Sequence, residues 1–307
     1  MPGTFEFVLQ AFDADLRLIA GRAESLGLDG VAVADHPGAT WSPFVALASA
    51  AAGTERLGIG TAVINCGVRD PLDIAADAAT LQAISSGRLT LGLGAGHTPS
   101  EWSQIGRERP SPSARIDRFE EVVRAVVALL AGDSVTAQGK HVSLANARLQ
   151  VSLTAAPKLL VGGANRRLVR LGCVLADVVE LGGIGRTLAD GHYHEPRWSP
   201  AQVDSAVAAF ESGCDASGRR PRLGALVQRL EITDDAEPAV RRYLDQVGKV
   251  IPAEIIPSVQ DVLECPYVLV GTVDELLGKL RRLHERWGFA RFTVRDLEQA
   301  AELVARL

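Results

Sequence analysis

The feature that most constrains the fold of this chain is an alternation of short apolar runs with longer helical stretches. Eight runs have the length and composition of strands. They are residues 5–10, 30–35, 56–64, 88–94, 158–163, 177–183, 223–232 and 290–295. Runs such as VAVA and LLVG are apolar on both faces, which is typical of parallel strands covered on both sides. Eight such units predict an α/β protein, a (β/α)₈ TIM barrel that forms a single domain over residues 1–307.

The helical stretches between these runs have clear start and stop signals. Apolar residues recur at helical spacing in 15–28, 115–130 and 272–287. Thr272 and Glu275 form a predicted capping box, and Gly288 is expected to end that helix. Three further starts pair an N-cap residue with proline at the next position: Ser42-Pro43, Asp70-Pro71 and Ser199-Pro200.

Two longer segments interrupt the alternation. The first, 133–157, follows the fourth predicted strand and contains GKHVSL and ARLQVSL, which we expect to pair as a small hairpin. The second, 184–199, is polar and is expected to be a loop that contributes a lid. Its residues His192, His194 and Glu195 lack a further well-spaced ligand, so we expect no metal.

Composition excludes several classes of partner. The 307 residues carry a net charge of −5 with no basic block, which argues against nucleic acid. No apolar run approaches the roughly 18 residues of a membrane helix. The 4 cysteines lie far apart without a CxxC pair, so we expect reduced thiols and a cytoplasmic location.

Active sites of such barrels form on the loops after the strands, which selects candidates by position. These are Gln10, Asp35, His36, Asn65, Cys66, His97, the stretch 162–165, Gly182, Gly183, Arg295 and Asp296. His36 is suited to proton transfer or to a hydrogen bond with a cofactor, or it is a loop histidine tied to Asp35. His97 follows the glycine-rich GLGAG, whose glycines favour either a close ligand or simply a tight barrel rim.

The stretch from Gly162 to Arg167 passes from a strand into a helix. Backbone N–H groups at a helix N-terminus, with arginine beside them, form an anion site, so this stretch is a candidate for binding phosphate. The alternative is a solvated first helical turn whose arginines face water.

The order of the motifs resembles that of the bacterial luciferase-like monooxygenase superfamily over nearly the whole chain. The similarity rests on SGRLTLGLGAG at 86–96 with Glu101-Trp102, Ala34-Asp35-His36, 60–63, 69–71, RIDRFEE at 115–121, 157–163 and 271–275. The closing Glu285-Arg-Trp-Gly288 is similar to the branch that depends on coenzyme F420, a deazaflavin hydride carrier. The resemblance implies a luciferase-like barrel with an insertion after strand 4, a homodimer, and a non-prolyl cis peptide that by position is Ala62–Val63.

The same resemblance implies roles for particular residues. His36 would lie near the cofactor ring, and His97 stands where some members carry a glutamate proton donor, so both are the expected catalytic residues. Gln10 and Trp41 are expected to face the substrate. The expected cofactor-binding residues are Asp35, Ala62, Val63, Asn65, Gly94, Gly96, Gly162, Gly163, Asn165 and Arg166, of which the last four match the loop that holds the cofactor's phosphate.

Three functions remain open at this point. The first is an oxidoreductase that transfers a hydride between coenzyme F420 and a small organic substrate. The second is an FMN-dependent monooxygenase that uses O₂ and reduced flavin. The third is a flavin-binding barrel without turnover. For the enzymes, a separate flavin or F420 reductase is an expected partner.

Overall fold

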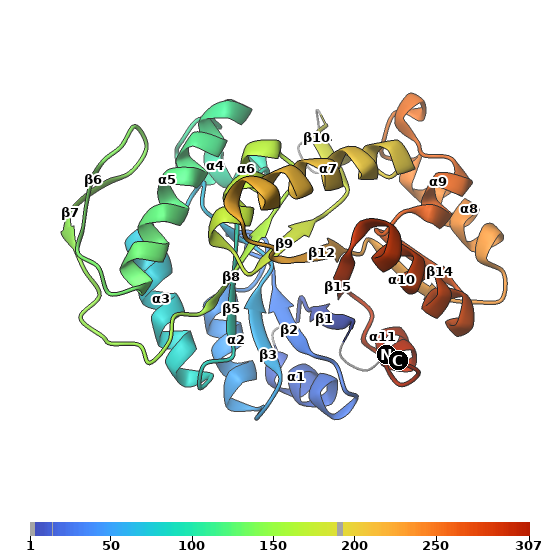
Figure 1. The fold of residues 1–307 in the computed structure, drawn as a ribbon, viewed down its shortest axis with the longest axis horizontal. Coiled ribbons are helices and arrows are strands. Elements are labelled where there is room, and N and C mark those ends of the chain that lie inside the picture. Colours follow the sequence, from blue (N-terminus) through green and yellow to red (C-terminus); the bar gives the residue numbers. More distant parts are fainter. Residues whose placement is uncertain (1–3, 14, 189–192) are drawn as a thin grey trace. The chain divides into compact units, whose positions relative to one another are not determined.

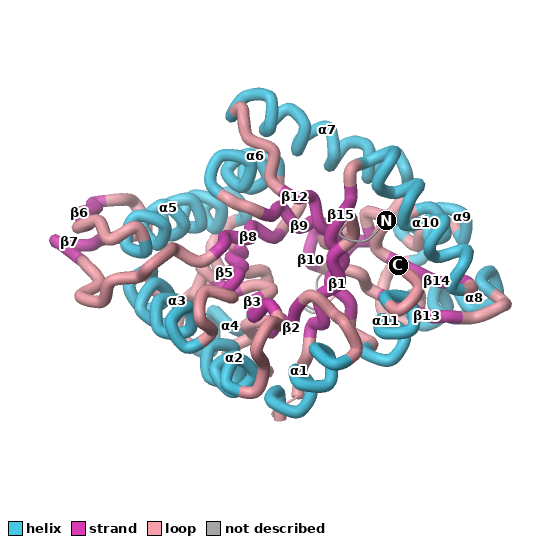
Figure 2. Tube along the Cα trace, turned by 60° about the horizontal axis from the view of Figure 1, so that its bottom comes forward, coloured by secondary structure: helices cyan, strands magenta, loops and turns pink. Residues whose placement is uncertain are grey.

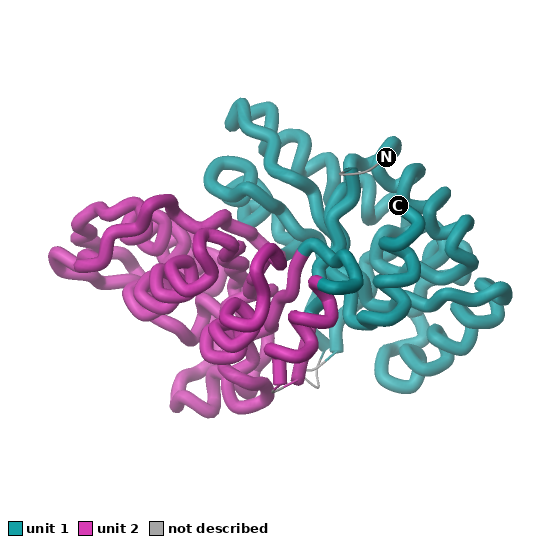
Figure 3. The backbone as a smooth tube through the Cα atoms, turned by 90° about the horizontal axis from the view of Figure 1, so that it is seen from below, with its two compact units in different colours: residues 1–10, 25–29, 163–307 teal, residues 11–24, 30–162 magenta. Residues whose placement is uncertain are grey.

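The structure is a computed structural model that describes residues 4–13, 15–188 and 193–307. Strands and helices alternate along its chain (Figures 1 and 2). The chain forms two compact units (Figure 3). One consists of residues 11–24 and 30–162 and is called the 30–162 unit below; the other consists of 1–10, 25–29 and 163–307 and is called the 163–307 unit.

Four parallel strands form the sheet of the 30–162 unit. They are β2 (Gly30–Val33), β3 (Gly58–Thr61), β5 (Leu89–Gly94) and β8 (Lys158–Gly162), paired in that order, and the short β4 (Ile64–Asn65) also pairs with β5. The helices are α1 (Leu16–Ser25), α2 (Pro43–Ala52), α3 (Pro71–Ile84), α4 (Pro99–Gln104) and α5 (Pro112–Leu130). Every residue of β2 is buried, as its uniformly apolar composition predicts.

The 163–307 unit also contains four parallel strands. They are β1 (Glu6–Gln10), β15 (Phe289–Val294), β12 (Arg222–Leu226) and β9 (Val178–Leu181), paired in that order. The helices are α6 (Arg166–Leu175), α7 (Pro200–Ser217), α8 (Ala236–Val247), the 3₁₀ turn η1 (Ala253–Ile255), α9 (Val259–Glu264), α10 (Val273–Trp287) and α11 (Leu297–Val304). Phe7 of β1 stacks on Phe292 of β15 with ring centroids 5.6 Å apart, and both side chains are fully buried.

These eight parallel strands coincide with the eight predicted runs, so the predicted α/β alternation is confirmed. Two runs were predicted too long. The run 56–64 is divided into β3 and β4, and the Ala62–Val63 peptide between them is cis, as the family resemblance implied. The run 223–232 is divided into β12 and β13 (Arg229–Ile232), because residues 229–232 pair with β14 (Val268–Gly271).

The insertion after the fourth predicted strand contains a hairpin, but its predicted pairing is wrong. The strands are β6 (Val135–Gln138) and β7 (Ser143–Ala147), not GKHVSL and ARLQVSL. The Glu121 carboxylate of α5 accepts hydrogen bonds from the backbone N–H groups of Lys140, His141 and Val142. These bonds hold 140–142 as the turn, which leaves 135–138 as the partner of β7.

The segment 184–199 was predicted to be a loop and instead contains a two-stranded antiparallel ribbon. Its strands are β10 (Ile184–Thr187) and β11 (His194–Pro196). His192 lies outside the described residues. Within the described ranges, no group of three or more His, Cys, Asp or Glu side chains is arranged to hold a metal ion.

The predicted helix signals agree with the structure. Thr272 and Glu275 form a reciprocal capping box on α10, and Gly288 ends that helix with a φ of +79°. Ser199 and Gln202 form a second capping box on α7. None of the helices in the described ranges combines the length and hydrophobicity of a transmembrane segment.

Candidate active site

In the 30–162 unit, the loop after β2, the end of β4 and helix α4 bring three polar side chains together. His36 Nδ1 lies 2.6 Å from Glu101 Oε1, and Asn65 Nδ2 donates to Glu101 Oε2 at 2.5 Å. Glu101 is 4% exposed, whereas the His36 side chain is 33% exposed. The buried carboxylate therefore anchors one nitrogen of an imidazole ring that itself reaches the surface.

The backbone around His36 is also fixed locally. Its N–H donates to Thr40 Oγ1 at 3.1 Å, and its carbonyl oxygen accepts from the N–H groups of Ala39 and Thr40. This turn, with Gly38 at a φ of +82°, follows directly from the end of β2. The ring of His97, after β5, lies edge-on to the His36 ring with centroids 5.7 Å apart. The structure thus brings the two predicted catalytic histidines side by side.

Asp35 is held by an arginine that the sequence analysis left without a role. Arg69 Nε and Nη2 donate to the two carboxylate oxygens of Asp35 at 2.6 and 2.8 Å, and the Asn65 N–H donates to Oδ2 at 3.0 Å. Because the Arg69 guanidinium donates to the Asp35 carboxylate, the pKa of Arg69 is raised. Asp35 therefore ties the β2 loop to the segment after β4, and its predicted contact with a cofactor stays a prediction.

Arg118 of α5 holds the segment after β4 in place. Its guanidinium donates to the carbonyl oxygens of Cys66 and Gly67 at 3.0 Å and to that of Arg69 at 3.0 Å. It also pairs with Asp70 at 3.2 Å, although only 9% of the residue is exposed. Glu101, Arg69 and Arg118 are the site-supporting residues that sequence reasoning missed. Each belongs to a quoted motif, but the partner of each lies 34 to 65 positions away in the chain, where spacing gives no signal.

The space beside the glycines at the ends of β5 and β8 is filled by neighbouring side chains of this chain. A Cβ on Gly94 would overlap the Val63 side chain, and one on Gly162 would lie 2.9 Å from Val63 Cγ1. Gly96 has a φ of +73°, and a Cβ there would overlap the Asn65 side-chain amide. Close packing against Val63 and Asn65 thus explains this glycine pattern, and the predicted cofactor contacts of Gly94 and Gly96 stay predictions.

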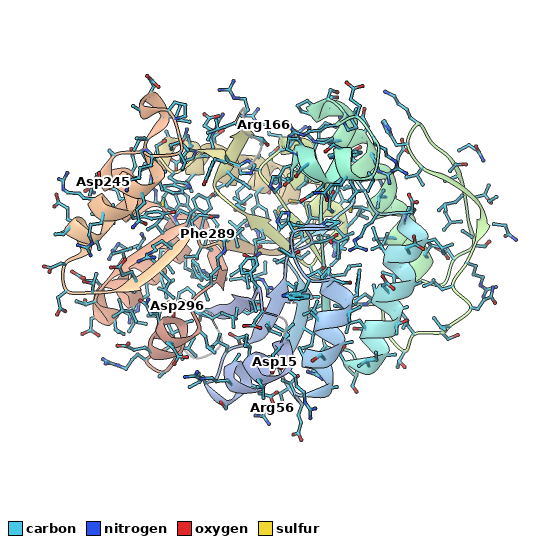
Figure 4. The ribbon with its side chains drawn as sticks, turned by 180° about the vertical axis from the view of Figure 1, so that it is seen from behind. Asp15, Arg56, Arg166, Asp245, Phe289 and Asp296 are labelled. Carbon is cyan, nitrogen blue, oxygen red and sulfur yellow. The ribbon has the colours of Figure 1, made fainter. Side chains whose placement is uncertain are left out.

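Of the residues predicted to bind phosphate, Gly163, Asn165 and Arg166 lie at or just before the start of α6 in the 163–307 unit, whereas Gly162 ends β8 in the 30–162 unit. Asn165 is the N-cap residue, and its side chain accepts from the Arg167 N–H at 2.9 Å. Gly163 has a φ of +142°, and its N–H donates to the Glu180 carbonyl oxygen. Asn165 and Arg166 are exposed, and Figure 4 shows Arg166 at the beginning of this helix. The helix N-terminus is capped, accessible and flanked by positive charge, a donor set that fits a phosphate group.

A second cluster of polar side chains in the 163–307 unit lies at or just after the ends of β1, β12 and β15. Arg295 Nε donates to Gln10 Oε1 at 2.9 Å, and Arg295 Nη1 lies 3.4 Å from Gln228 Oε1. Gln10 is 3% exposed, so its amide is fixed beside the guanidinium. Trp41, the other residue predicted to face the substrate, is 57% exposed just before α2 in the 30–162 unit. The roles of Gln10 and Trp41 stay predictions.

Comparison with known proteins places this α/β chain in a family. The model of the luciferase-like monooxygenase family matches residues 13–294, so the chain belongs to this family. A solved F420-dependent secondary alcohol dehydrogenase, in complex with an F420–acetone adduct, superimposes with a TM-score of 0.78 at 19% identity. That match covers 99% of this chain and 98% of the other, and it shows that the predicted TIM barrel fold is correct.

Curated relatives carry two kinds of name. An F420-dependent glucose-6-phosphate dehydrogenase of Amycolatopsis mediterranei (strain U-32) is 35% identical over 148 residues, which are 44% of this chain and 43% of that protein. The match thus spans less than half of that dehydrogenase. The 4-hydroxyprotoasukamycin monooxygenase of Streptomyces nodosus subsp. asukaensis is 28% identical over 298 residues, covering 90% of this chain and 78% of that protein.

Proposed function

We propose that this protein is an oxidoreductase that uses coenzyme F420 and transfers a hydride between the deazaflavin and a small organic substrate. The observation that carries the proposal is the partly exposed His36 ring, anchored at Nδ1 by buried Glu101 and lying beside His97. The F420-dependent relatives support the choice of cofactor. When bound, the deazaflavin supplies a ring carbon that accepts or donates a hydride.

The chain's own residues supply the proton. Hydride transfer at a substrate carbon is balanced by a proton that moves on or off a neighbouring heteroatom. Because a carboxylate accepts hydrogen bonds, Glu101 favours the His36 tautomer with hydrogen on Nδ1, and proton exchange then takes place at Nε2. His97 is the second acid–base group. Asn65 keeps Glu101 in place through the other carboxylate oxygen.

Each unit carries candidate binding groups, and the two sets are assigned separately. In the 163–307 unit, Asn165 and Arg166 would hold the phosphate through backbone N–H groups at the start of α6 and one guanidinium. In the 30–162 unit, Asp35, Asn65, Ala62, Val63, Gly94 and Gly96 would shape the surface for the ring. Gln10, fixed by Arg295, and exposed Trp41 would contact the substrate.

The second candidate is an FMN-dependent monooxygenase, favoured by the 28% identity to a monooxygenase over 90% of this chain. Parallel titrations with F420 and with FMN, followed by quenching of the 4 tryptophans, separate the two candidates. We expect the tighter binding with F420, followed by substrate-dependent absorbance change of the deazaflavin without oxygen. Tighter FMN binding with oxygen uptake in the presence of reduced FMN would replace the proposal with the monooxygenase. Binding of neither would favour a barrel without turnover.

The same proposal includes the setting in which the enzyme works. All 4 cysteines are free thiols, which fits a reducing compartment such as the cytoplasm. We also propose a homodimer, and a separate reductase that regenerates the reduced cofactor. Size-exclusion chromatography with light scattering tests the dimer, since a monomer at micromolar concentration would contradict it.

A further inference from the structure

Two cysteines of the 163–307 unit face each other across a helix pair. Helices α6 and α7 lie side by side in both views of the chain (Figures 1 and 2). The sulfur atoms of Cys173 on α6 and Cys214 on α7 are 3.8 Å apart, and the two residues are 0% and 4% exposed. Cys66 and Cys265 are buried as well, and the Cys265 thiol points to the Val262 carbonyl oxygen instead.

The packing around the pair leaves room for the two sulfurs to lie next to each other. A Cβ on Gly213 would lie 2.9 Å from Cys173 Sγ, so glycine at this position leaves the room that the sulfur occupies. Beyond the pair, Ser217 Oγ donates to the carbonyl oxygens of Cys173 and Cys214, each at 3.2 Å. Arg219 donates to the carbonyl oxygens of Val174 and Ala176 at the end of α6. These contacts do not involve sulfur, so the thiols are held opposite each other independently of any bond between them.

We propose that Cys173 and Cys214 are a modification site: a dithiol that hydrogen peroxide oxidises to an intramolecular disulfide. A disulfide bond is about 2.05 Å long, so the two sulfurs must approach each other by roughly 1.8 Å for the bond to form. The established family membership does not assign such a site, and the proposal does not depend on the cofactor.

The chemistry balances with hydrogen peroxide as the named oxidant. One thiolate attacks a peroxide oxygen, the O–O bond breaks, and a sulfenic acid and hydroxide form. The second thiol then attacks the sulfenic sulfur, the S–S bond forms, and the sulfenic oxygen leaves as water. In total two thiols and one peroxide give one disulfide and two waters, and a dithiol reductant reverses the change.

Burial decides which oxidants can act. It raises the pKa of the Cys173 thiol to about 12 and also raises the pKa of Cys214, so little thiolate is present at neutral pH. The reaction is therefore slow, and a small uncharged oxidant is better suited to reach the pair than a bulky disulfide. For this reason the probe is hydrogen peroxide itself, applied to the full chain.

Thiol counting and peptide mapping test the proposal on the wild-type protein. After peroxide, quenching and denaturation, we expect 2 of the 4 thiols to remain. Trypsin should then release a linked pair of peptides, 171–186 joined to 198–219, that separates on reduction. Closing the bond over 41 positions should raise the thermal unfolding midpoint by about 5 °C.

Matched variants identify the pair. Cys173→Ser and Cys214→Ser should each abolish the linked peptides, whereas Cys66→Ser and Cys265→Ser, which remove other buried thiols, should retain them. Gly213→Ala should slow disulfide formation several-fold because the new methyl group displaces the Cys173 sulfur. Four thiols remaining after prolonged peroxide, or oxidation only to unlinked sulfinic acids, would overturn the proposal. So would a disulfide that includes Cys66 or Cys265.

Discussion

Asp35 and Glu101 in the 30–162 unit and Lys279 in the 163–307 unit are all buried, but their surroundings differ. The Asp35 carboxylate accepts hydrogen bonds from Nε and Nη2 of Arg69. The Glu101 carboxylate is bound by His36 and Asn65. Lys279 donates to the carbonyl oxygens of Val262 and Val268, and burial lowers its pKa to about 8. The charges of Asp35 and Glu101 are compensated by charged and amide partners, whereas that of Lys279 is compensated by neutral backbone.

Glu180 is a second buried charge of the 163–307 unit, and its partners are a hydroxyl and an arginine. Its carboxylate bonds to the Thr293 hydroxyl and lies 3.9 Å from Arg291 Nε. Burial nevertheless raises the pKa of Glu180, because these partners only partly offset the lost hydration. The candidate binding groups of this unit, Asn165 and Arg166, are instead exposed at a helix start. The first unit thus uses buried charge to orient loops, and the second presents accessible donors.

The sharpest way to break this comparison is to remove the imidazole that the buried carboxylate orients. His36→Asn should lower kcat by about 10²–10³-fold because proton transfer at Nε2 is lost. His97→Asn should lower it by about 10-fold, and Glu101→Gln by an intermediate amount because the amide still fills the site. Steady-state kinetics with F420 provides the measurement, with the cofactor Kd as a check on folding. A larger loss in the His97 variant would reverse the assignment of the two histidines.

The hydrogen bonds of Arg118 to the segment after β4 should contribute to the free energy of unfolding. Arg118→Ala removes hydrogen bonds to the carbonyl oxygens of Cys66, Gly67 and Arg69, so the free energy of unfolding should fall by about 3 kcal/mol. Arg124→Ala, on the exposed side of the same helix, is the matched control and should change it by less than about 0.5 kcal/mol. Urea unfolding measures both. Equal effects would mean that the buried guanidinium does not fix the segment after β4.

The pH dependence of stability tests whether buried Lys279 is held only by neutral backbone. Its folded pKa of about 8 lies below the ordinary lysine value, so between these values the unfolded chain binds the extra proton. The contribution of Lys279 to stability therefore rises as pH increases from about 8 to about 10.5, and is lost as pH falls through 8. The difference in unfolding free energy between wild type and Lys279→Met should change by about 3 kcal/mol over this range, in favour of wild type at high pH. A difference independent of pH would show that the ammonium is not desolvated.

Local patterns predicted much of this fold, and long-range pairing supplied the rest. The capping box at Thr272 could be placed because it depends on a short motif, and the cis bond at Ala62–Val63 because the family resemblance implied it. The pairing of β13 with β14 could not, since residues 223–232 read as one continuous strand and the division of that run depends on a partner 39 residues later. In the site, both histidines were found by their positions after strands, but Glu101 was not. Its role follows from His36, 65 positions earlier, and only the folded chain brings the two together.

The smallest predicted effect concerns Arg166, which is exposed at the start of α6. Arg166→Ala should weaken F420 binding about 10-fold, since one guanidinium–phosphate hydrogen bond contributes roughly 1.4 kcal/mol, and should leave kcat unchanged at saturating cofactor. Arg170→Ala is the control, because Arg170 is also exposed on α6 but lies one turn further from the helix start. Tryptophan quenching measures both affinities, and the Arg166 effect should decrease with added salt because the contact is exposed to solvent. Equal losses in the two variants would indicate general attraction to the basic helix, and the start of α6 would then lose its assignment as the phosphate site.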